Sequence, residues 1–144
     1  MLLPISLTAA GAAALLHIWL SVRVSQVRRS QQILHGDGGS PALLKRMRAH
    51  ANYAENLPIF LVLLVLLELA GVWSLPLWIA TITFFLARIL HAFGMDKDKL
   101  SPLRVIGIAG GWLVLLGLSG WAIATTYAEM GSMPVRQQAP IIKG

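Results

Sequence analysis

The sequence predicts an all-α integral membrane protein, a four-transmembrane-helix bundle that forms a single domain over residues 1–144. Its composition is too apolar for a soluble domain: 56% of the residues are hydrophobic and 12% are charged, whereas roughly 25% of an average soluble domain is charged. Several apolar segments also reach the length of about 20 residues that crosses a bilayer. The expected helices cover residues 4–29, 41–71, 75–95 and 102–128, and a polar tail follows over residues 129–144.

The first helix is expected to be a retained membrane span, because no basic region precedes it and its apolar part is longer than that of a signal peptide. Arg23, Arg28 and Arg29 mark its exit on the cytoplasmic side. Arg23 would face inward if the helix continues past it, which the absence of proline and glycine before Gly36 allows. In the alternative interpretation, all three arginines extend toward lipid headgroups.

The second helix carries a stripe of polar side chains. Lys45, Arg48, Asn52 and Glu55 follow at i, i+3, i+7 and i+10 and therefore share one helix face. Ionisable groups at membrane depth are costly and normally face a protein interior or a wet cavity. The stripe is therefore a candidate binding site. Pro58, which follows it, predicts a kink.

The third and fourth helices bring further polar groups to the same level. Arg88 and His91 are i, i+3 neighbours near the inner end of the third helix, and Arg104 opens the fourth. Gly107 and Gly111 form a GxxxG pair, which allows close approach of helices in lipid.

Charge distribution predicts the orientation. The first and third loops and their flanks carry most of the positive charge and the loop at 72–74 carries none, so both chain ends are expected on the periplasmic side. Arg48, Arg88, His91 and Arg104 then lie near the cytoplasmic face.

Three arginines against the single carboxylate Glu55 are costly unless an anionic ligand completes the group. Arginine binds carboxylates well, while Glu55 and Asn52 could bind an ammonium group. A ligand with several carboxylates and one amine would match. Taken alone, each of these residues could instead be an interfacial or structural group.

Other function classes lack support. The net charge of +6 arises at the ends of apolar segments, as membrane topology requires, so nucleic-acid binding is not expected. The absence of cysteine excludes disulfides and a cysteine nucleophile. No metal site is expected, because the histidines are scattered and form no HxxxH pair; they are His17, His35, His50 and His91.

The run from Arg48 to Pro58, RAHANYAENLP, resembles the signature of the MAPEG family, the membrane-associated proteins of eicosanoid and glutathione metabolism. ARILH at 87–91, followed by Arg104, is similar to the third- and fourth-helix motifs of that family. The short cysteine-free chain looks like a bacterial inner-membrane member.

The resemblance implies a left-handed four-helix bundle that assembles as a homotrimer and binds glutathione between subunits near the cytoplasmic face. Arg104 would stabilise the glutathione thiolate, which is the nucleophile. Arg23 and Arg28 both fit the position of a first-helix arginine that contributes in the family, and Arg23 is preferred. The residues that would bind or line the tripeptide are Arg48, Asn52, Glu55, Arg88 and His91.

Two positions depart from the pattern of the eicosanoid-processing members. Ala51 and Met95 stand where several of those proteins have arginine and tyrosine, and the absence of the tyrosine removes a possible hydrogen-bond donor to the thiol. Hydrophobic electrophiles from the bilayer remain plausible second substrates.

Three functions therefore compete. The leading interpretation is a membrane-bound glutathione-dependent transferase or peroxidase that conjugates or reduces hydrophobic electrophiles. The second is a non-catalytic ligand-binding or scaffold protein on the same fold. The third is a small proton-coupled multidrug transporter, which is disfavoured because Glu55 lies among arginines and not alone in an uncharged helix.

Overall fold

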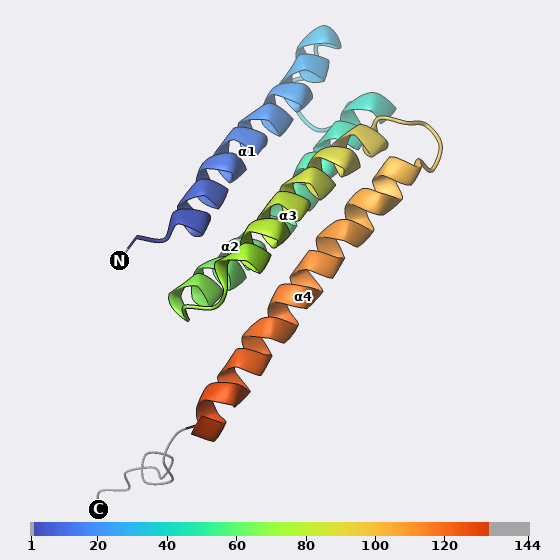
Figure 1. Cartoon of the computed structure of the whole chain (residues 1–144). Helices are drawn as coiled ribbons and strands as arrows, with labels where there is room; N and C mark the ends of the chain where they lie inside the picture. Colours follow the sequence, from blue (N-terminus) through green and yellow to red (C-terminus); the bar gives the residue numbers. More distant parts are fainter. Residues whose placement is uncertain (1, 133–144) are drawn as a thin grey trace, which may run out of the picture.

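The computed structural model describes residues 2–132, and the secondary structure in this range is entirely α-helical. The helices are α1 (Pro4–Ser30), α2 (Pro41–Leu69), α3 (Ser74–Met95) and α4 (Pro102–Ser132) (Figure 1). Each is long and apolar enough to cross a membrane. The predicted all-α membrane fold with four spanning helices is thereby confirmed.

The helix boundaries follow local signals. The Ser40 hydroxyl accepts a hydrogen bond from the Leu43 N–H at 3.2 Å and so caps α2. The helix continues through Pro58 and ends at Leu69, and Gly71 follows with a φ of 70°. Glycine adopts this left-handed conformation without steric cost, which suits it to the turn.

The fourth helix is longer than expected. It extends through Ser132 and therefore includes residues 129–132, which the sequence analysis assigned to the polar tail. Alanine, glutamate and methionine at 128–130 favour helix, and no proline occurs between Pro102 and Pro134. The remainder of the predicted tail lies outside the described residues.

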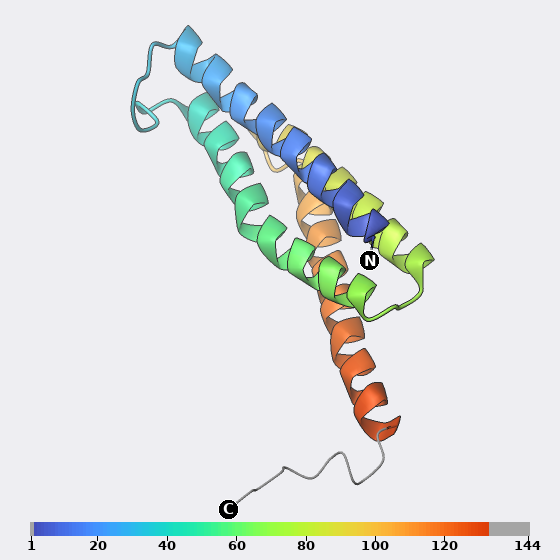
Figure 2. The same ribbon diagram turned by 90° about the vertical axis from the view of Figure 1, so that its left-hand side faces the viewer.

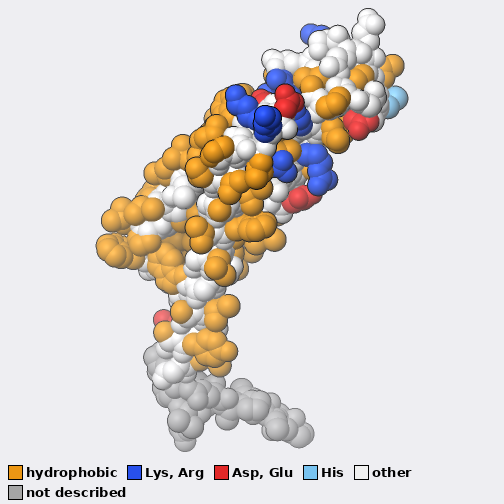
Figure 3. Space-filling model, turned by 90° about the vertical axis from the view of Figure 1, so that its right-hand side faces the viewer, with side chains coloured by type: hydrophobic (Ala, Val, Ile, Leu, Met, Phe, Trp, Pro, Cys, Tyr) orange, Lys and Arg blue, Asp and Glu red, His pale blue; other side chains and the backbone are white. Residues whose placement is uncertain are grey.

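The helices alternate in direction, so the end of α1, the start of α2, the end of α3 and the start of α4 lie at one end of the molecule (Figure 1). Most charged side chains gather at that end, and hydrophobic side chains cover most of the remaining length (Figure 3). The last part of α4 extends beyond the ends of the other helices (Figures 1 and 2). The fold therefore concentrates the candidate site at one end of the bundle.

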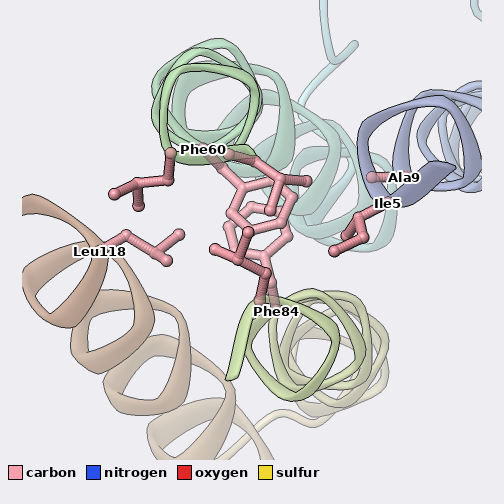
Figure 4. Close-up of a cluster of buried hydrophobic side chains, with 8 residues drawn as sticks. Ile5, Ala9, Phe60, Phe84 and Leu118 are labelled. Atoms are coloured by element: carbon pink, nitrogen blue, oxygen red, sulfur yellow. The ribbon is translucent and has the colours of Figure 1, made fainter. Parts of the chain in front are cut away.

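The main core joins all four helices. Phe60 of α2 and Phe84 of α3 stack with ring centroids 3.9 Å apart and planes within 2°. Ile5 and Ala9 of α1 and Leu118 of α4 belong to the same buried cluster (Figure 4). Since lipid is as apolar as these side chains, close packing is what holds them together.

At the end remote from the charges, Glu68 of α2 caps α1. Its carboxylate accepts hydrogen bonds from the backbone N–H groups of Ile5 and Ser6 at 2.9 and 2.8 Å, and from the Ser6 hydroxyl at 2.6 Å. The first N–H groups of a helix have no partner within the helix and carry partial positive charge. A carboxylate there is stabilising, and it anchors the start of α1 to the end of α2.

The GxxxG pair of α4 packs against α3 of the same chain. A Cβ atom added to Gly107 would lie 2.6 Å from the Ala87 carbonyl oxygen and 2.7 Å from the His91 Cα. A Cβ at Gly111 would overlap the guanidinium of Arg88. The two glycines therefore make room for the α3 backbone and for one large charged side chain.

Candidate functional site

The centre of the candidate site is the Arg88 side chain, which is 2% exposed. Its Nη1 donates to the Asn52 side-chain oxygen at 2.7 Å, and its Nη2 donates to the Gly107 carbonyl at 3.1 Å. The guanidinium also lies 5.3 Å from the centroid of the Phe84 ring. Arg88 thus links α2, α3 and α4 inside the bundle, where the sequence analysis expected a residue that lines the site.

His91 lies one turn further along α3 and is also buried. Its imidazole approaches the backbone of Arg104, and its Nδ1 atom is buried without a hydrogen-bond partner. A Cβ at Gly94 would overlap the backbone of Arg104. The last turn of α3 therefore lies directly against the first turn of α4, which brings His91 and Arg104 together as the topology predicts.

The other predicted ligands are open to the surroundings. Arg48, Glu55 and Arg104 are exposed. None of the three forms an ion pair with another residue in the described part of the chain. Arg48 and Glu55 are seven residues apart, which is close to two helical turns, so both share the face of α2 that carries Asn52. The predicted stripe leaves charged groups available for an external partner.

Lys45, which begins that stripe, has a partner within the chain. Its ammonium donates to the Asp98 carboxylate at 2.5 Å. Asp98 lies in the loop between α3 and α4, and the hydrogen bond and positive charge of Lys45 hold the pKa of this carboxyl below its usual value. The pair connects the start of α2 to the loop that leads into Arg104.

Arg23 points inward and is 7% exposed, in keeping with a helix that continues to Ser30. It pairs with Asp96 at the end of α3 and lies over the Trp19 ring, 4.7 Å from its centroid. Arg46 of α2 donates to the Arg23 carbonyl at 2.9 Å, and its Nε is 3.7 Å from the same carboxylate. Arg23 is thus bound into a separate cluster on α1, α2 and the end of α3.

Arg28, the alternative first-helix arginine, is half-buried. Its Nη2 lies 3.5 Å from the Met47 sulfur, and its buried Nη1 has no hydrogen-bond partner. No direct contact joins Arg23 or Arg28 to Asn52 or Arg88 within the described part of one chain. The first-helix arginines and the remaining candidates therefore form separate groups in the single subunit.

The sequence analysis did not single out Asp96, Asp98 and Arg46. They line a cavity of about 440 Å³ together with residues such as Gln31 and Lys45. The chain has six acidic residues, and two of them fall within this loop opposite the basic ends of α1 and α2. Charge complementarity was the available signal, but the sequence does not show which cation each carboxylate reaches.

An apolar groove of about 420 Å³ runs between α1 and α3. Ala12, Leu16 and Trp19 line it from α1, and Phe85 and Ile89 line it from α3. It ends beside Trp19 and therefore near Arg23. The groove could accommodate an apolar molecule close to the charged end of the bundle.

Comparison with known proteins supports the resemblance seen in the motifs. The sequence pattern of the MAPEG family matches residues 6–124. The chain is also similar to the inner membrane protein YecN of Escherichia coli K12, with 31% identity over 104 residues, or 72% of this chain and 79% of that protein. YecN of Escherichia coli O6:H1 strain CFT073 shows the same identity and coverage.

Proposed function

The chain belongs to the MAPEG family, and from that premise we propose that it is a glutathione-dependent transferase or peroxidase of the inner membrane that acts on hydrophobic electrophiles. The proposal includes assembly as a homotrimer, with glutathione bound between subunits near the cytoplasmic face. It also includes periplasmic chain ends, because most positive charge gathers at the opposite end of the bundle.

The observation that carries the proposal is the set of exposed charges on the polar face of α2 and in the first turn of α4. Arg48, Glu55 and Arg104 have no ionic partner in the described part of their own chain, and charges at membrane depth require one. Glutathione offers two carboxylates and one ammonium group. Arg48 would bind a carboxylate, and Glu55 would bind the ammonium.

Arg104 would act on the thiol. A guanidinium next to the sulfur stabilises the thiolate relative to the thiol, so the thiol proton is released to water and a nucleophile remains. In conjugation, the sulfur lone pair forms a bond to an electrophilic carbon; a leaving group departs with the electron pair of its broken bond or, in an addition, the displaced electron pair is protonated by water. In peroxide reduction, two glutathione molecules supply two electrons to the O–O bond and leave as the disulfide.

The first-helix arginine would come from a neighbouring subunit. Arg23 is engaged by Asp96, whereas the Nη1 of Arg28 has no hydrogen-bond partner within the described residues. The structure therefore favours Arg28 for this role, although the sequence analysis preferred Arg23. The apolar groove between α1 and α3 could bring an acceptor from the bilayer toward this end.

Calorimetric titration of glutathione into the detergent-purified protein tests the binding site. We expect saturable binding by the wild type and its loss in Arg48→Ala. Arg29→Ala is the matched control, because it removes an exposed positive charge from the same end of the bundle without touching the stripe. A folded wild-type protein that binds no glutathione at millimolar concentration would contradict the proposal.

A second candidate, a non-catalytic binding protein, is favoured by Met95. This side chain packs against the buried cluster that contains Leu16, Leu20 and Tyr53, and it cannot donate a hydrogen bond to a thiol. Ultraviolet absorbance of the bound thiolate separates the two functions. Binding without a thiolate signal at neutral pH and without turnover of electrophiles would favour the non-catalytic function.

A further inference from the structure

A pair of histidines lies between α1 and α2, outside the groups described above. His17 and His50 are distant in the sequence, but the packing of the two helices places Nδ1 of His17 3.2 Å from Nε2 of His50. The ring centroids are 4.6 Å apart, and the ring planes are tilted by 58°. The Ser21 hydroxyl, one turn after His17 on α1, lies 3.5 Å from the same His50 nitrogen.

We propose that His17 and His50 form a two-histidine binding site for a borderline transition-metal dication such as zinc, nickel or copper. Two imidazole nitrogens bound to a tetrahedral metal at about 2.0–2.1 Å lie roughly 3.3 Å from each other. The observed separation of 3.2 Å between the nitrogens is close to this value. The other coordination positions remain for water or an exchangeable ligand.

The two helices are held in place around the pair. The Tyr53 hydroxyl donates to the Ala13 carbonyl at 2.7 Å. Ala13 lies one turn before His17, and Tyr53 lies three residues after His50, so the hydrogen bond crosses the helix interface beside the histidines. Both Ala13 and Tyr53 are buried. The helix backbones that carry the two imidazoles are therefore fixed relative to each other, which lowers the entropic cost of binding a ligand between them.

The surroundings indicate which metals would bind. No carboxylate contacts either imidazole in the described part of the chain. The same residues contain no cluster of three or more histidine, aspartate or glutamate side chains that could hold a metal. Magnesium and calcium, which prefer oxygen ligands, would gain little here. Metals with high affinity for imidazole would be selected instead. His17 is exposed on the surface of the single subunit, so the pair lies at the edge of the α1–α2 interface and not in its buried interior.

Zinc titration by calorimetry tests the site in the full-length, detergent-purified protein without glutathione. We expect one zinc ion per chain and no heat from magnesium. His17→Ala and His50→Ala should each lower zinc affinity by at least about tenfold, the lower end of what loss of an outer-shell partner costs. The double variant should lose little more, because either single variant already destroys the chelate.

His35→Ala is the matched control, since His35 is exposed in the loop between α1 and α2 and should bind zinc as the wild type does. Equal zinc binding by the wild type and the double variant would overturn the proposal. The same holds if His35→Ala lowers the affinity as strongly as His17→Ala. If the alanine variants do not fold, glutamine at both positions retains polarity and provides the same comparison.

Electron paramagnetic resonance of bound copper gives a second readout that a purely structural hydrogen bond would not produce. The wild type should show coupling to two imidazole nitrogens, and each single variant should show coupling to one. Binding should weaken as the pH falls, because protonated imidazoles cannot coordinate a metal. A spectrum unchanged by both single variants would place the copper elsewhere and refute the site.

Discussion

The guanidinium of Arg88 donates a hydrogen bond to the side-chain oxygen of Asn52 at 2.7 Å. This contact connects the buried face of α3 to the polar stripe of α2. The same guanidinium also donates to the Gly107 carbonyl of α4. Arg88 therefore fixes the polar stripe of α2 relative to α4, whose first turn carries Arg104. Arg88 therefore positions the candidate site from within the bundle.

Replacing Arg88 by methionine should destabilise the protein, because the change removes the donor for both oxygen atoms. Hydrogen bonds to charged groups are worth roughly 1.5–3 kcal/mol each, so the loss of both should cost about 3–6 kcal/mol. Thermal unfolding in detergent measures the change. Arg29→Met, at an exposed position, is the control, and an equal effect of the two substitutions would contradict the structural role of Arg88.

Gly111→Ala should force the Arg88 side chain to move, because the added Cβ would overlap its guanidinium. Overpacking of this kind typically costs about 1–3 kcal/mol. Gly117→Ala is a matched control on the same helix, since the Cβ it would add has no atom of another helix within 4 Å. Comparable melting temperatures for the two variants would show that the α3–α4 contact tolerates the extra methyl group.

Glu68→Gln should weaken the cap on α1, because the amide cannot accept hydrogen bonds from the Ile5 and Ser6 backbone through both of its terminal atoms. The expected cost is about 1–2 kcal/mol, in the range measured for helix caps. Hydrogen exchange should show faster opening of the first turn of α1. Thr8→Ala, which removes an exposed hydroxyl bonded only to the Pro4 carbonyl, should leave that turn protected.

Asp96→Asn should loosen the junction of α1, α2 and the loop after α3, because Arg23 and Arg46 then lose their shared carboxylate. Limited proteolysis of the loop between α3 and α4 should become faster. Asp98→Asn is the comparison, since its exposed pair with Lys45 also joins this loop to α2 but should contribute little, so this variant should be cleaved more slowly than Asp96→Asn. Equal cleavage rates for Asp96→Asn and the wild type would argue against this anchoring role.

The ion pair between Lys45 and Asp98 should depend on pH in a definite direction. The hydrogen bond and charge of Lys45 lower the pKa of the Asp98 carboxyl in the folded protein. The stabilisation is therefore fully present above the pKa of the unfolded carboxyl, about 3.9. It is lost as the pH falls through the lower folded value. The effect should be small because the pair is solvent-exposed. Thermal unfolding of the wild type and of Asp98→Asn between pH 5 and 2 measures this pH-dependent stabilisation. A wild type that gains stability relative to the variant as the pH falls would contradict the predicted direction.

Several features of the site could be predicted from local signals. Arg48, Asn52 and Glu55 lie at helical spacing in an otherwise apolar chain, and periodicity is enough to place them on one face. The Ser40–Pro41 pair also predicts the start of α2, because cap and proline preferences act over a few residues. The end of α4 was harder to predict. Gly131 disfavours helix less strongly than proline does, and the helix continues past it to Ser132.

Composition and hydropathy were sufficient to predict the membrane class, the four spans and the concentration of charge at one end. A span must match the bilayer in length and in the hydropathy of its residues, and both can be read directly from the sequence. The sequence did not predict which side chains meet between helices. The rotation and packing of the helices decide three such contacts: Arg23 with Asp96, Glu68 with the start of α1, and His17 with His50. These contacts join residues 33 to 73 positions apart, and helix rotation is decided by side-chain packing across all four helices, which no local pattern encodes.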